Sequence, residues 1–457
     1  MIYLLSLICA ALPTYLIRFS IFGIPTTALE MLIYLAIAAQ IVLAITKLKR
    51  KNEKVLMGEA SVLRRQSTTI KNIKLSYILY PLILLIIAVI ISTIISPDKR
   101  VALGIAKGWF FDPILLFFLI ILNVKSERDL GKIVYGLATG AAFVSLWGIL
   151  QWFGFDYLLP HQRADVFNSF QSYLAAGRAF GPFESPNYLG MYIAPIAALT
   201  LGYRLNFQFS ISNFQKKSNF QRPITNNYLL SFFLVSMLLA LLFTKSLGAW
   251  LGFGTAAIFL GYFILKLYFL AKPGLASRDI SHKSVFRISY LIFLISIIVA
   301  GYFLLNKIGT GRITDSFAAR KEVWQVSWYL IKHHPIFGIG LGTFRSIYEQ
   351  TIPTIHFPPI NWLQMHPHNI FLAFWLSTGI LGLISFVWIL YLFVKRIFLI
   401  PNSYRIISIS LMATMIAILT HGLIDSTYWK NDLSAMFWIT VALAFVNWKA
   451  KENDSIS

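Results

Sequence analysis

Runs of apolar residues recur along the whole chain, and each is about as long as a membrane-spanning helix or somewhat shorter. A helix needs roughly 20 predominantly apolar residues to cross a bilayer, and inside the hydrocarbon its backbone polar groups must be paired within the segment. The runs cover residues 2–17, 27–46, 76–96, 102–123, 133–153, 186–203, 228–244, 247–270, 289–305, 369–394, 406–422 and 433–448. The sequence therefore predicts an all-α polytopic membrane protein with about 12 transmembrane helices, in which residues 1–457 form a single membrane domain.

The charge of the chain fixes the expected orientation of these helices. In this chain 57% of the residues are hydrophobic and 13% are charged, whereas about a quarter of the residues of soluble proteins are charged. The formal charge of +22 would indicate nucleic acid in a soluble protein, but here the placement of the basic residues decides. If both termini lie inside, most Lys and Arg fall in inner connectors, as the positive-inside rule requires. We therefore expect cytoplasmic termini, contact with membrane lipids and no nucleic-acid partner.

One long polar segment, residues 306–367, falls on the predicted outer face between the ninth and tenth spans. Its first part predicts a helix from Asp315 or Ser316 to about Lys332, because Asp and Ser are favoured at helix N-termini and Pro335 stops the helix. The GIGLG stretch that follows resembles a phosphate-binding loop only weakly, and we interpret it as a tight turn.

Prolines shape the second part of this loop. Pro353, Pro358 and Pro359 predict an extended stretch. Pro367 then places His368 in or just before the first turn of the tenth span. The loop should therefore bring part of an active site to the membrane surface.

The outer face carries cations and histidines and lacks a spacing that would hold a metal. No HExxH or paired acidic motif occurs there, so a metal site is not indicated. The candidates for binding an anion are Arg178, Lys245, Lys307, Arg312, Arg320, Lys321, His161, His356, His366 and His368.

Two of these candidates have both a functional and a structural interpretation. Arg320 either grips a diphosphate through its planar, permanently charged fork or is a solvated charge on an amphipathic helix. His368 lies near a helix N-terminus, which favours the neutral imidazole and a role as base; otherwise it is an interfacial anchor. His366, two residues earlier, could take its place.

Four stretches resemble motifs of the O-antigen ligase and polymerase superfamily. HPHNIFLAFWLSTGILGLISF resembles the family signature H-N-x-x-L-x-x-x-x-E-x-G-x-x-G, and RKEVWQVSWYLIKHHPIFGIGLGTF resembles the R-x-x-x-W run before it. RAFGPFESPNYLG resembles an external R-x-x-G-x-F-x-x-P-N segment, and HGLIDSTYW resembles a late H-x-L-x-D motif. The four occur in the family's order from about residue 130 onward. Two positions depart from the pattern: Leu247 replaces the arginine of S-R-G, and Ser377 replaces the signature glutamate.

The resemblance implies transfer of a glycan from an undecaprenyl-diphosphate carrier to a hydroxyl acceptor, without a metal or other cofactor, at the outer face of the bacterial inner membrane. The acceptor would be a lipid A-core sugar, another glycan or a protein side chain. Carried over by position, Arg320 would hold the diphosphate and His368 would activate the acceptor or steady the leaving group. The substrate-binding residues would be Arg178, Asn187, Lys245, Trp324, His366, Asn369 and Asp425.

Two alternatives stay open at this point. A polysaccharide polymerase of the same superfamily would use the same chemistry on a different acceptor. A transporter of lipid-linked glycan would need polar residues along the middle of several spans, where Asp112 is the clearest charge. Because polarity is concentrated outside the spans, the sequence favours an enzyme.

The predicted orientation is testable by labelling. An impermeant thiol reagent applied to intact cells should modify a cysteine placed by Gly311→Cys, since position 311 falls in the outer loop. The matched variant Ile280→Cys, in a predicted inner connector, should be protected. The opposite pattern would overturn the orientation.

Overall fold

The computed structural model describes residues 1–448 apart from 22, 57–75, 156–171, 174, 215–224 and 271–309. The described chain is mostly helical, as predicted. Its first part contains α1 (Ile2–Ala10), the 3-10 turn η1 (Leu12–Leu16), the strands β1 (Arg18–Ile21) and β2 (Ile24–Thr27), α2 (Ala28–Leu56), α4 (Ser76–Ile95), α5 (Lys99–Ile105), the π-helical turn η2 (Ala106–Phe111), α6 (Asp112–Asn123) and α7 (Glu127–Trp152).

The second part holds the remaining helices. They are α9 (Pro186–Phe214), α10 (Thr225–Thr244), α11 (Leu247–Leu270), α13 (Thr310–His333), α14 (Phe344–Ile355), α15 (Ile370–Phe398), the short η4 (Asn402–Tyr404), α16 (Arg405–Gly422) and α17 (Asn431–Phe445). Among the described residues, seven helical segments are long and apolar enough to cross a membrane. The chain is therefore a polytopic membrane protein, while the count of 12 spans stays a prediction.

The helices form a bundle whose interior is apolar. α16 packs between α9 and α11, α4 lies along α15, and α7 contacts α1 and α10. Aromatic rings fill the centre, where Phe374 stacks on Phe386 with centroids 4.1 Å apart and also contacts Tyr428. Burying such large apolar side chains against each other favours a single packed arrangement. The predicted ninth span, residues 289–305, lies outside the described residues.

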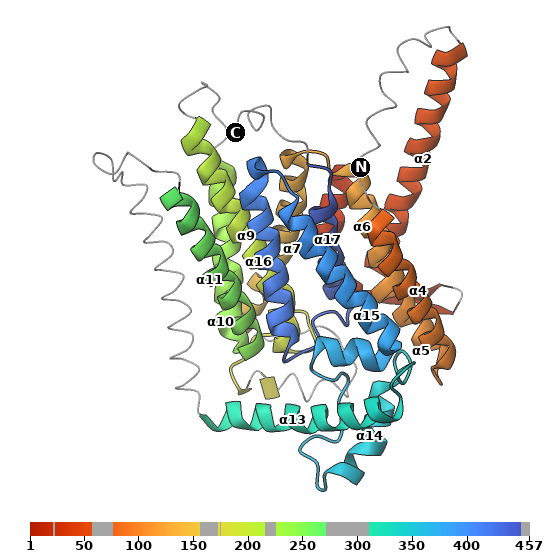
Figure 1. Ribbon diagram of the computed structural model, residues 1–457. Helices are drawn as coiled ribbons and strands as arrows, with labels where there is room; N and C mark the ends of the chain where they lie inside the picture. The colour runs from red at the N-terminus through yellow and green to blue at the C-terminus, as the bar shows by residue number, and fades with distance from the viewer. Residues whose placement is uncertain are drawn as a thin grey trace.

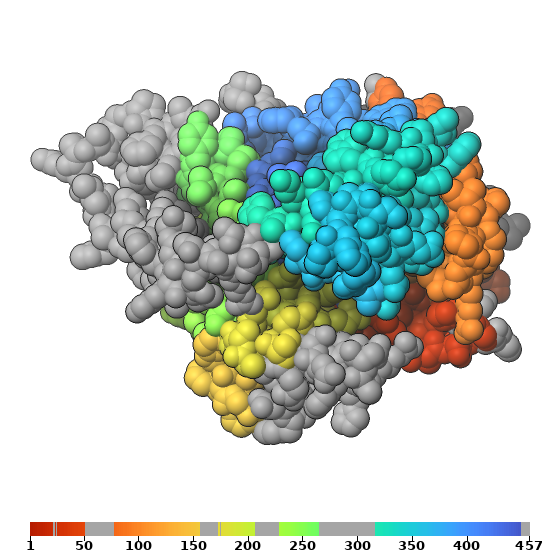
Figure 2. All heavy atoms as spheres, turned by 90° about the horizontal axis from the view of Figure 1, so that it is seen from below, coloured from red at the N-terminus to blue at the C-terminus, as the bar shows by residue number. Residues whose placement is uncertain are grey.

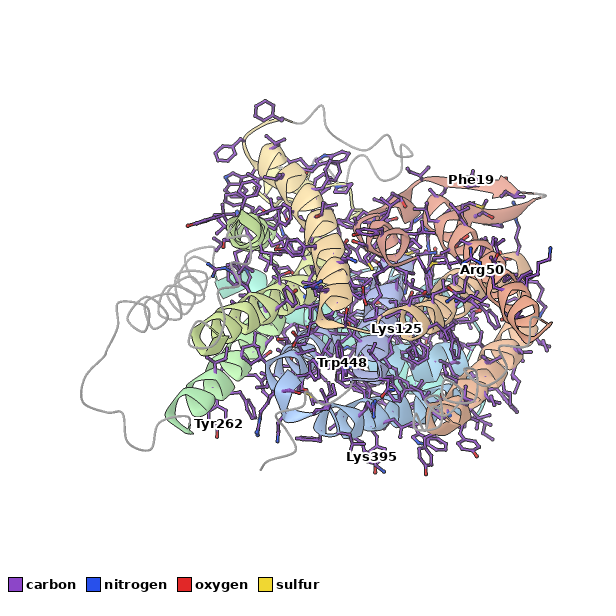
Figure 3. All side chains as sticks on the ribbon, turned by 90° about the horizontal axis from the view of Figure 1, so that it is seen from above. Phe19, Arg50, Lys125, Tyr262, Lys395 and Trp448 are labelled. Atoms are coloured by element: carbon purple, nitrogen blue, oxygen red, sulfur yellow. The ribbon has the colours of Figure 1, made fainter. Side chains whose placement is uncertain are left out.

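The amphipathic segment α13 lies across one end of the bundle, nearly perpendicular to the other helices (Figure 1). Seen from that end, α13, α14 and the chain that follows cover the middle of the molecule (Figure 2). The N-terminus lies at the opposite end (Figure 1). Figure 3 looks onto that opposite end and labels Arg50, Lys125 and Lys395, which belong to or border the connectors predicted to be inside. Which end of the bundle faces the cytoplasm stays a prediction.

Several boundaries differ from the sequence-based expectation. The first apolar run, residues 2–17, is not one helix: α1 ends at Ala10, Pro13 follows in η1, and an antiparallel hairpin comes next with Arg18 paired to Thr27. The loop helix α13 begins at Thr310, earlier than the predicted start at Asp315 or Ser316, and ends at His333, one residue beyond the predicted Lys332. The expectation that Pro353 lies in extended chain was wrong.

Pro353 lies in the last turn of α14 instead. The helix ends two residues later, at Ile355, and His356 is already extended. Because proline has no N–H, position 353 cannot donate to the carbonyl four residues earlier, so the ladder loses one hydrogen bond just before the helix ends.

A break in α15 fixes the chain that follows α13 against the bundle. Gly379 has φ +69° and ψ −176°, a conformation that is essentially restricted to glycine. The break lets Ile380 donate its N–H to the Ile336 carbonyl at 3.0 Å, and Ile339 donates to Leu376 at 2.7 Å. A side chain at position 379 would approach the Ile336 oxygen to 2.3 Å. Glycine at position 379 therefore permits both the bend in α15 and the close contact with Ile336.

The turn that packs against this break, in the GIGLG stretch, also needs glycine for its backbone conformation and for close contact with α15. Gly338 has φ +70°, and a Cβ there would lie 2.3 Å from the Leu376 carbonyl oxygen. Gly340 and Gly342 also have positive φ. The interpretation of GIGLG as turn chemistry is thus confirmed.

We predict that Gly379→Ala lowers stability, because the new methyl group meets the Ile336 carbonyl and the backbone is strained. A residue forced into such a conformation costs about 1–3 kcal/mol. The measurement is thermal unfolding of detergent-purified protein. Gly104→Ala in α5 is the control, since a Cβ there meets nothing within 4 Å. An equal transition temperature for both variants would contradict this account of the break.

Candidate functional site

His368 lies immediately before α15, where the backbone is held in an unusual conformation. Its φ is +49°, a left-handed value that few residues other than glycine adopt. Two contacts hold it there. The Trp324 indole Nε1 donates to the His368 carbonyl at 3.3 Å, and the next residue, Asn369, caps α15 by accepting from Phe371 N and Leu372 N. Backbone strain of this kind is found at functional sites, so the conformation itself marks His368.

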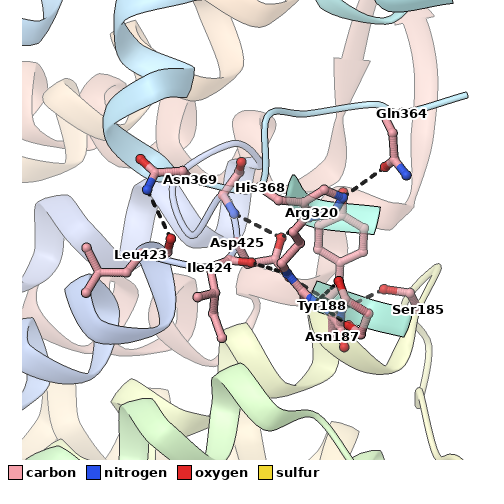
Figure 4. A network of polar contacts seen from close by, with 12 residues as sticks. Ser185, Asn187, Tyr188, Arg320, Gln364, His368, Asn369, Leu423, Ile424 and Asp425 are labelled. Carbon is pink, nitrogen blue, oxygen red and sulfur yellow. Dashed lines mark hydrogen bonds and ion pairs between the residues drawn. The ribbon is translucent and has the colours of Figure 1, made fainter. Parts of the chain in front are cut away.

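Both ring nitrogens of His368 have partners. Nδ1 lies 3.0 Å from Asp425 Oδ1, and Nε2 lies 2.9 Å from the Gln364 amide Oε1 (Figure 4). The carboxylate can only accept a hydrogen bond when ionised, so Nδ1 carries the proton. A carboxylate on one imidazole nitrogen leaves the other nitrogen, Nε2, to take or give a proton.

Asp425 is almost fully buried, with 5% of its surface exposed. Burial raises the pKa of its carboxyl, but the positive charges of His368 and Arg320 and the hydrogen bond from His368 outweigh burial. The net pKa lies well below its ordinary value, so Asp425 is ionised throughout the neutral range. Its Oδ1 also accepts from the Ser426 N–H at 2.9 Å.

Arg178 and Asn187 extend this network toward the start of α9. Asn187 Nδ2 donates to Asp425 Oδ2 at 3.4 Å (Figure 4), and Arg178 Nη2 donates to Asn187 Oδ1 at 3.1 Å. Arg178 Nε donates to the Thr244 carbonyl at 2.9 Å. The two residues named from the R-x-x-G-x-F-x-x-P-N resemblance therefore lie in one chain of polar contacts with His368.

Arg320 reaches the same site from α13. Its Nε donates to the Ile424 carbonyl at 2.7 Å, and its Nη1 contacts the carbonyl of Ser316, one turn earlier, at 3.2 Å. Ile424 directly precedes Asp425, so Arg320 and His368 approach the same short turn although they are far apart in the sequence. Asn369 completes the set, because its Nδ2 donates to the Leu423 carbonyl at 3.0 Å (Figure 4).

Lys245 and His366 have other surroundings. Lys245 Nζ donates to the Ala176 carbonyl at 3.0 Å and lies 5.1 Å from the centre of the Trp152 ring. The His366 ring packs edge-on against Trp109 at 6.1 Å. Burial, helped by the charge of His368, lowers the pKa of His366 to about 4. His366 is thus a neutral ring in an aromatic cluster.

The remaining candidates are not brought to this network. His356 Nε2 contacts Gln325 Oε1 at 2.7 Å on the exposed side of α13, and Lys321 is exposed. Lys307, His161 and the Arg312 side chain lie outside the described residues. Within the described part, no three His, Cys, Asp or Glu side chains gather to hold a metal ion.

Three residues near the site were missed from the sequence. Gln364 gave no signal, because a glutamine in a loop is common. His421, the first residue of HGLIDSTYW, is 2% exposed and packs against Gly248, where a Cβ would lie 2.5 Å from its Nε2. Lys430 pairs with Glu184 and lies 3.6 Å over the ring of Tyr188. The H-x-L-x-D spacing could have indicated His421, since it places the histidine one helical turn before the aspartate.

Comparison with known proteins shows that part of the chain, including several residues of this site, matches a known family. Residues 232–387 match the family model described as O-Antigen ligase, and this stretch includes Arg320, Trp324, Gln364 and His368.

Two curated proteins, each named "Putative polysaccharide ligase", are similar over 132 residues at 30% identity. One is from Rickettsia conorii and the other from Rickettsia felis. The matched stretch is 28% of this chain and 31% or 32% of the relatives, so the chain spans about a third of their length. Together with the membrane helices, these matches confirm the resemblance drawn from the motifs: residues 232–387 are similar to the O-antigen ligase family.

Proposed function

We propose that this protein transfers a glycan from an undecaprenyl-diphosphate carrier to a hydroxyl acceptor at the outer face of the bacterial inner membrane. The observation that carries the proposal is the His368–Asp425 pair with Arg320 bound to the adjacent carbonyl. A base and a fixed cation at one turn are the groups that displacement of a diphosphate from a sugar requires.

His368 acts on the acceptor in this reaction. The acceptor oxygen attacks the anomeric carbon, the bond from that carbon to the diphosphate oxygen breaks, and the hydroxyl proton passes to His368 Nε2. Asp425 supports the step because its ionised carboxylate holds Nδ1–H and stabilises the imidazolium that forms. The left-handed backbone fixed by Trp324 keeps the ring in this orientation.

Arg320 acts on the leaving group. Its Nε and Nη1 already bond to Ile424 and Ser316, which leaves the Nη2 end of the fork to bind phosphate oxygens. A preorganised cation stabilises the charge that develops as the diphosphate leaves. A positively charged guanidinium does this without a metal ion.

Other cations support the donor. Arg178 is joined to Asp425 through Asn187, and we assign it to the rim of the donor site. The family arginine of S-R-G is replaced by Leu247, and Lys245, two residues earlier, contacts Ala176. Arg178 is therefore the better placed second cation, and Lys245 becomes a positioning residue for the Ala176–Arg178 segment.

Three classes of acceptor fit this chemistry: a lipid A-core sugar, another lipid-linked glycan and a protein side chain. With a lipid-linked glycan as acceptor the same site would act as a polymerase. A single addition to a lipid A-core acceptor indicates a ligase, whereas a ladder of lengthening lipid-linked products indicates a polymerase.

We predict that Arg320→Ala and His368→Ala each reduce glycan transfer by roughly a hundredfold or more, the effect of removing a group that acts in the transition state. Transfer is measured with purified protein in liposomes and a lipid-linked donor. Expression and membrane insertion should stay near wild type.

His366→Ala is the matched control for the choice of histidine. Its ring packs on Trp109 and is neutral, so we expect less than about a fivefold loss of transfer, in line with lost packing. If His366→Ala is as inactive as His368→Ala, or if His368→Ala transfers normally, the catalytic assignment is wrong.

We also predict that Asp425→Asn reduces transfer strongly, because an amide cannot stabilise the imidazolium and changes the hydrogen-bonding of Nδ1. Replacement of an orienting aspartate of this kind costs up to roughly four orders of magnitude. Asn187→Ala removes one donor to Asp425 but keeps the His368–Asp425 contact, so it is expected to be milder. Equal, small effects for both variants would remove Asp425 from the mechanism.

A further inference from the structure

We propose that Gln364 occupies the position of the acceptor hydroxyl, so that the acceptor must displace its side chain before His368 can act. The inference rests on the proposed function and adds to it the acceptor subsite and a gating residue. Gln364 Oε1 lies 2.9 Å from His368 Nε2. Because Nδ1 is bonded to Asp425, Nε2 is the nitrogen that must meet the acceptor.

The contact blocks proton transfer in either protonation state of the ring. A protonated Nε2 donates to the amide oxygen, and an unprotonated Nε2 accepts from the amide NH₂ group, since an amide offers both. In each case the single in-plane position at Nε2 is filled. An alcohol takes that position only after the amide leaves.

The chain around Gln364 is attached so that the amide can leave without loss of its neighbours' contacts. The Ile360 N–H donates to Glu322 Oε2 at 3.0 Å, and the Tyr348 hydroxyl donates to the Asn361 carbonyl at 3.1 Å. Both anchors lie before Gln364. Among the described contacts, residues 362–365 have one polar contact, the one from Gln364 to His368.

The composition of this segment indicates the class of acceptor. Residues 350–367 contain no Asp, Glu, Lys or Arg. The apolar side chains around Gln364 are exposed, including Trp362 at 49% and Met365 at 56%. An uncharged surface with an exposed indole suits the face of a neutral sugar rather than a phosphorylated or ionised group. We therefore assign the subsite to a hydroxyl of an uncharged sugar.

The gate has a chemical purpose. If Nε2 were open, water could attack the anomeric carbon in place of the acceptor. The bond to the diphosphate would break, the water proton would pass to His368, and free glycan would be released. Gln364 prevents this loss of donor until an acceptor arrives.

The first test measures donor hydrolysis with the full-length protein in lipid nanodiscs. Without acceptor, Gln364→Ala should release free glycan roughly five- to tenfold faster than wild type, the factor expected from one lost hydrogen bond. Gln350→Ala, an exposed glutamine on α14, should match wild type. With a neutral-sugar acceptor, Gln364→Ala should still transfer.

The second test does not depend on activity. Diethyl pyrocarbonate acylates imidazole nitrogens, and peptide mass spectrometry reports each histidine separately. His368 should be modified several-fold faster in Gln364→Ala than in wild type or Gln350→Ala. Unchanged reactivity would overturn the gate, because it means that Gln364 does not cover Nε2.

The combined results separate the two proposals. Wild-type protein that transfers no glycan contradicts the proposed function, and His368 reactivity still decides whether Gln364 covers the ring. If Gln364→Ala loses hydrolysis and transfer together, Gln364 is a positioning residue for His368 and the gate is refuted.

Discussion

The structure of the site depends on one short turn after α16, residues 423–425. Three consecutive residues there receive polar contacts from separate parts of the chain: Leu423 from Asn369, Ile424 from Arg320, and Asp425 from His368 and Asn187. The Asp425 carboxylate is buried and ionised, and such a charge is costly unless it is hydrogen-bonded. Its need for partners holds α9, α15 and the turn together.

The long segment after α13 is positioned by a second set of contacts. Trp324 and Arg320 lie one turn apart on α13, so both reach toward the start of α15, one to the His368 carbonyl and one to Ile424. The turn at Gly338 also packs closely against α15, at the break around Gly379. The loop is thus fixed to α15 both before and within the helix, which accounts for the defined position of His368.

Local signals in the sequence predicted much of this arrangement. Apolar runs located most of the described helices, with close bounds for α4, α11 and α16, and Pro335 follows the end of α13 as expected of a helix stop. The pairing of Arg320 with His368 came from the family resemblance, because nothing in the spacing of distant residues shows that they meet.

Other features depend on tertiary contacts and could not be predicted. The helix of the predicted first span ends at Ala10, and a 3-10 turn takes up most of the rest before the β1–β2 hairpin. Gln364 gains importance only from the position of His368 Nε2. Lys245 has the charge expected of a phosphate ligand, yet the left-handed turn that carries it directs Nζ to Ala176. Residue type predicted the chemistry available on the outer face, while packing selected which residues share a site.

The central claim is that Arg320 and His368 act on the two sides of one glycosyl bond. The most direct measurement is a cryo-electron microscopy structure of the protein with a non-hydrolysable phosphonate analogue of the lipid-linked donor. The account predicts phosphate oxygens within about 3 Å of the Arg320 guanidinium, with the anomeric carbon facing His368 Nε2. A diphosphate bound at Lys245 or elsewhere, with Arg320 still engaged only by Ile424 and Ser316, would contradict it.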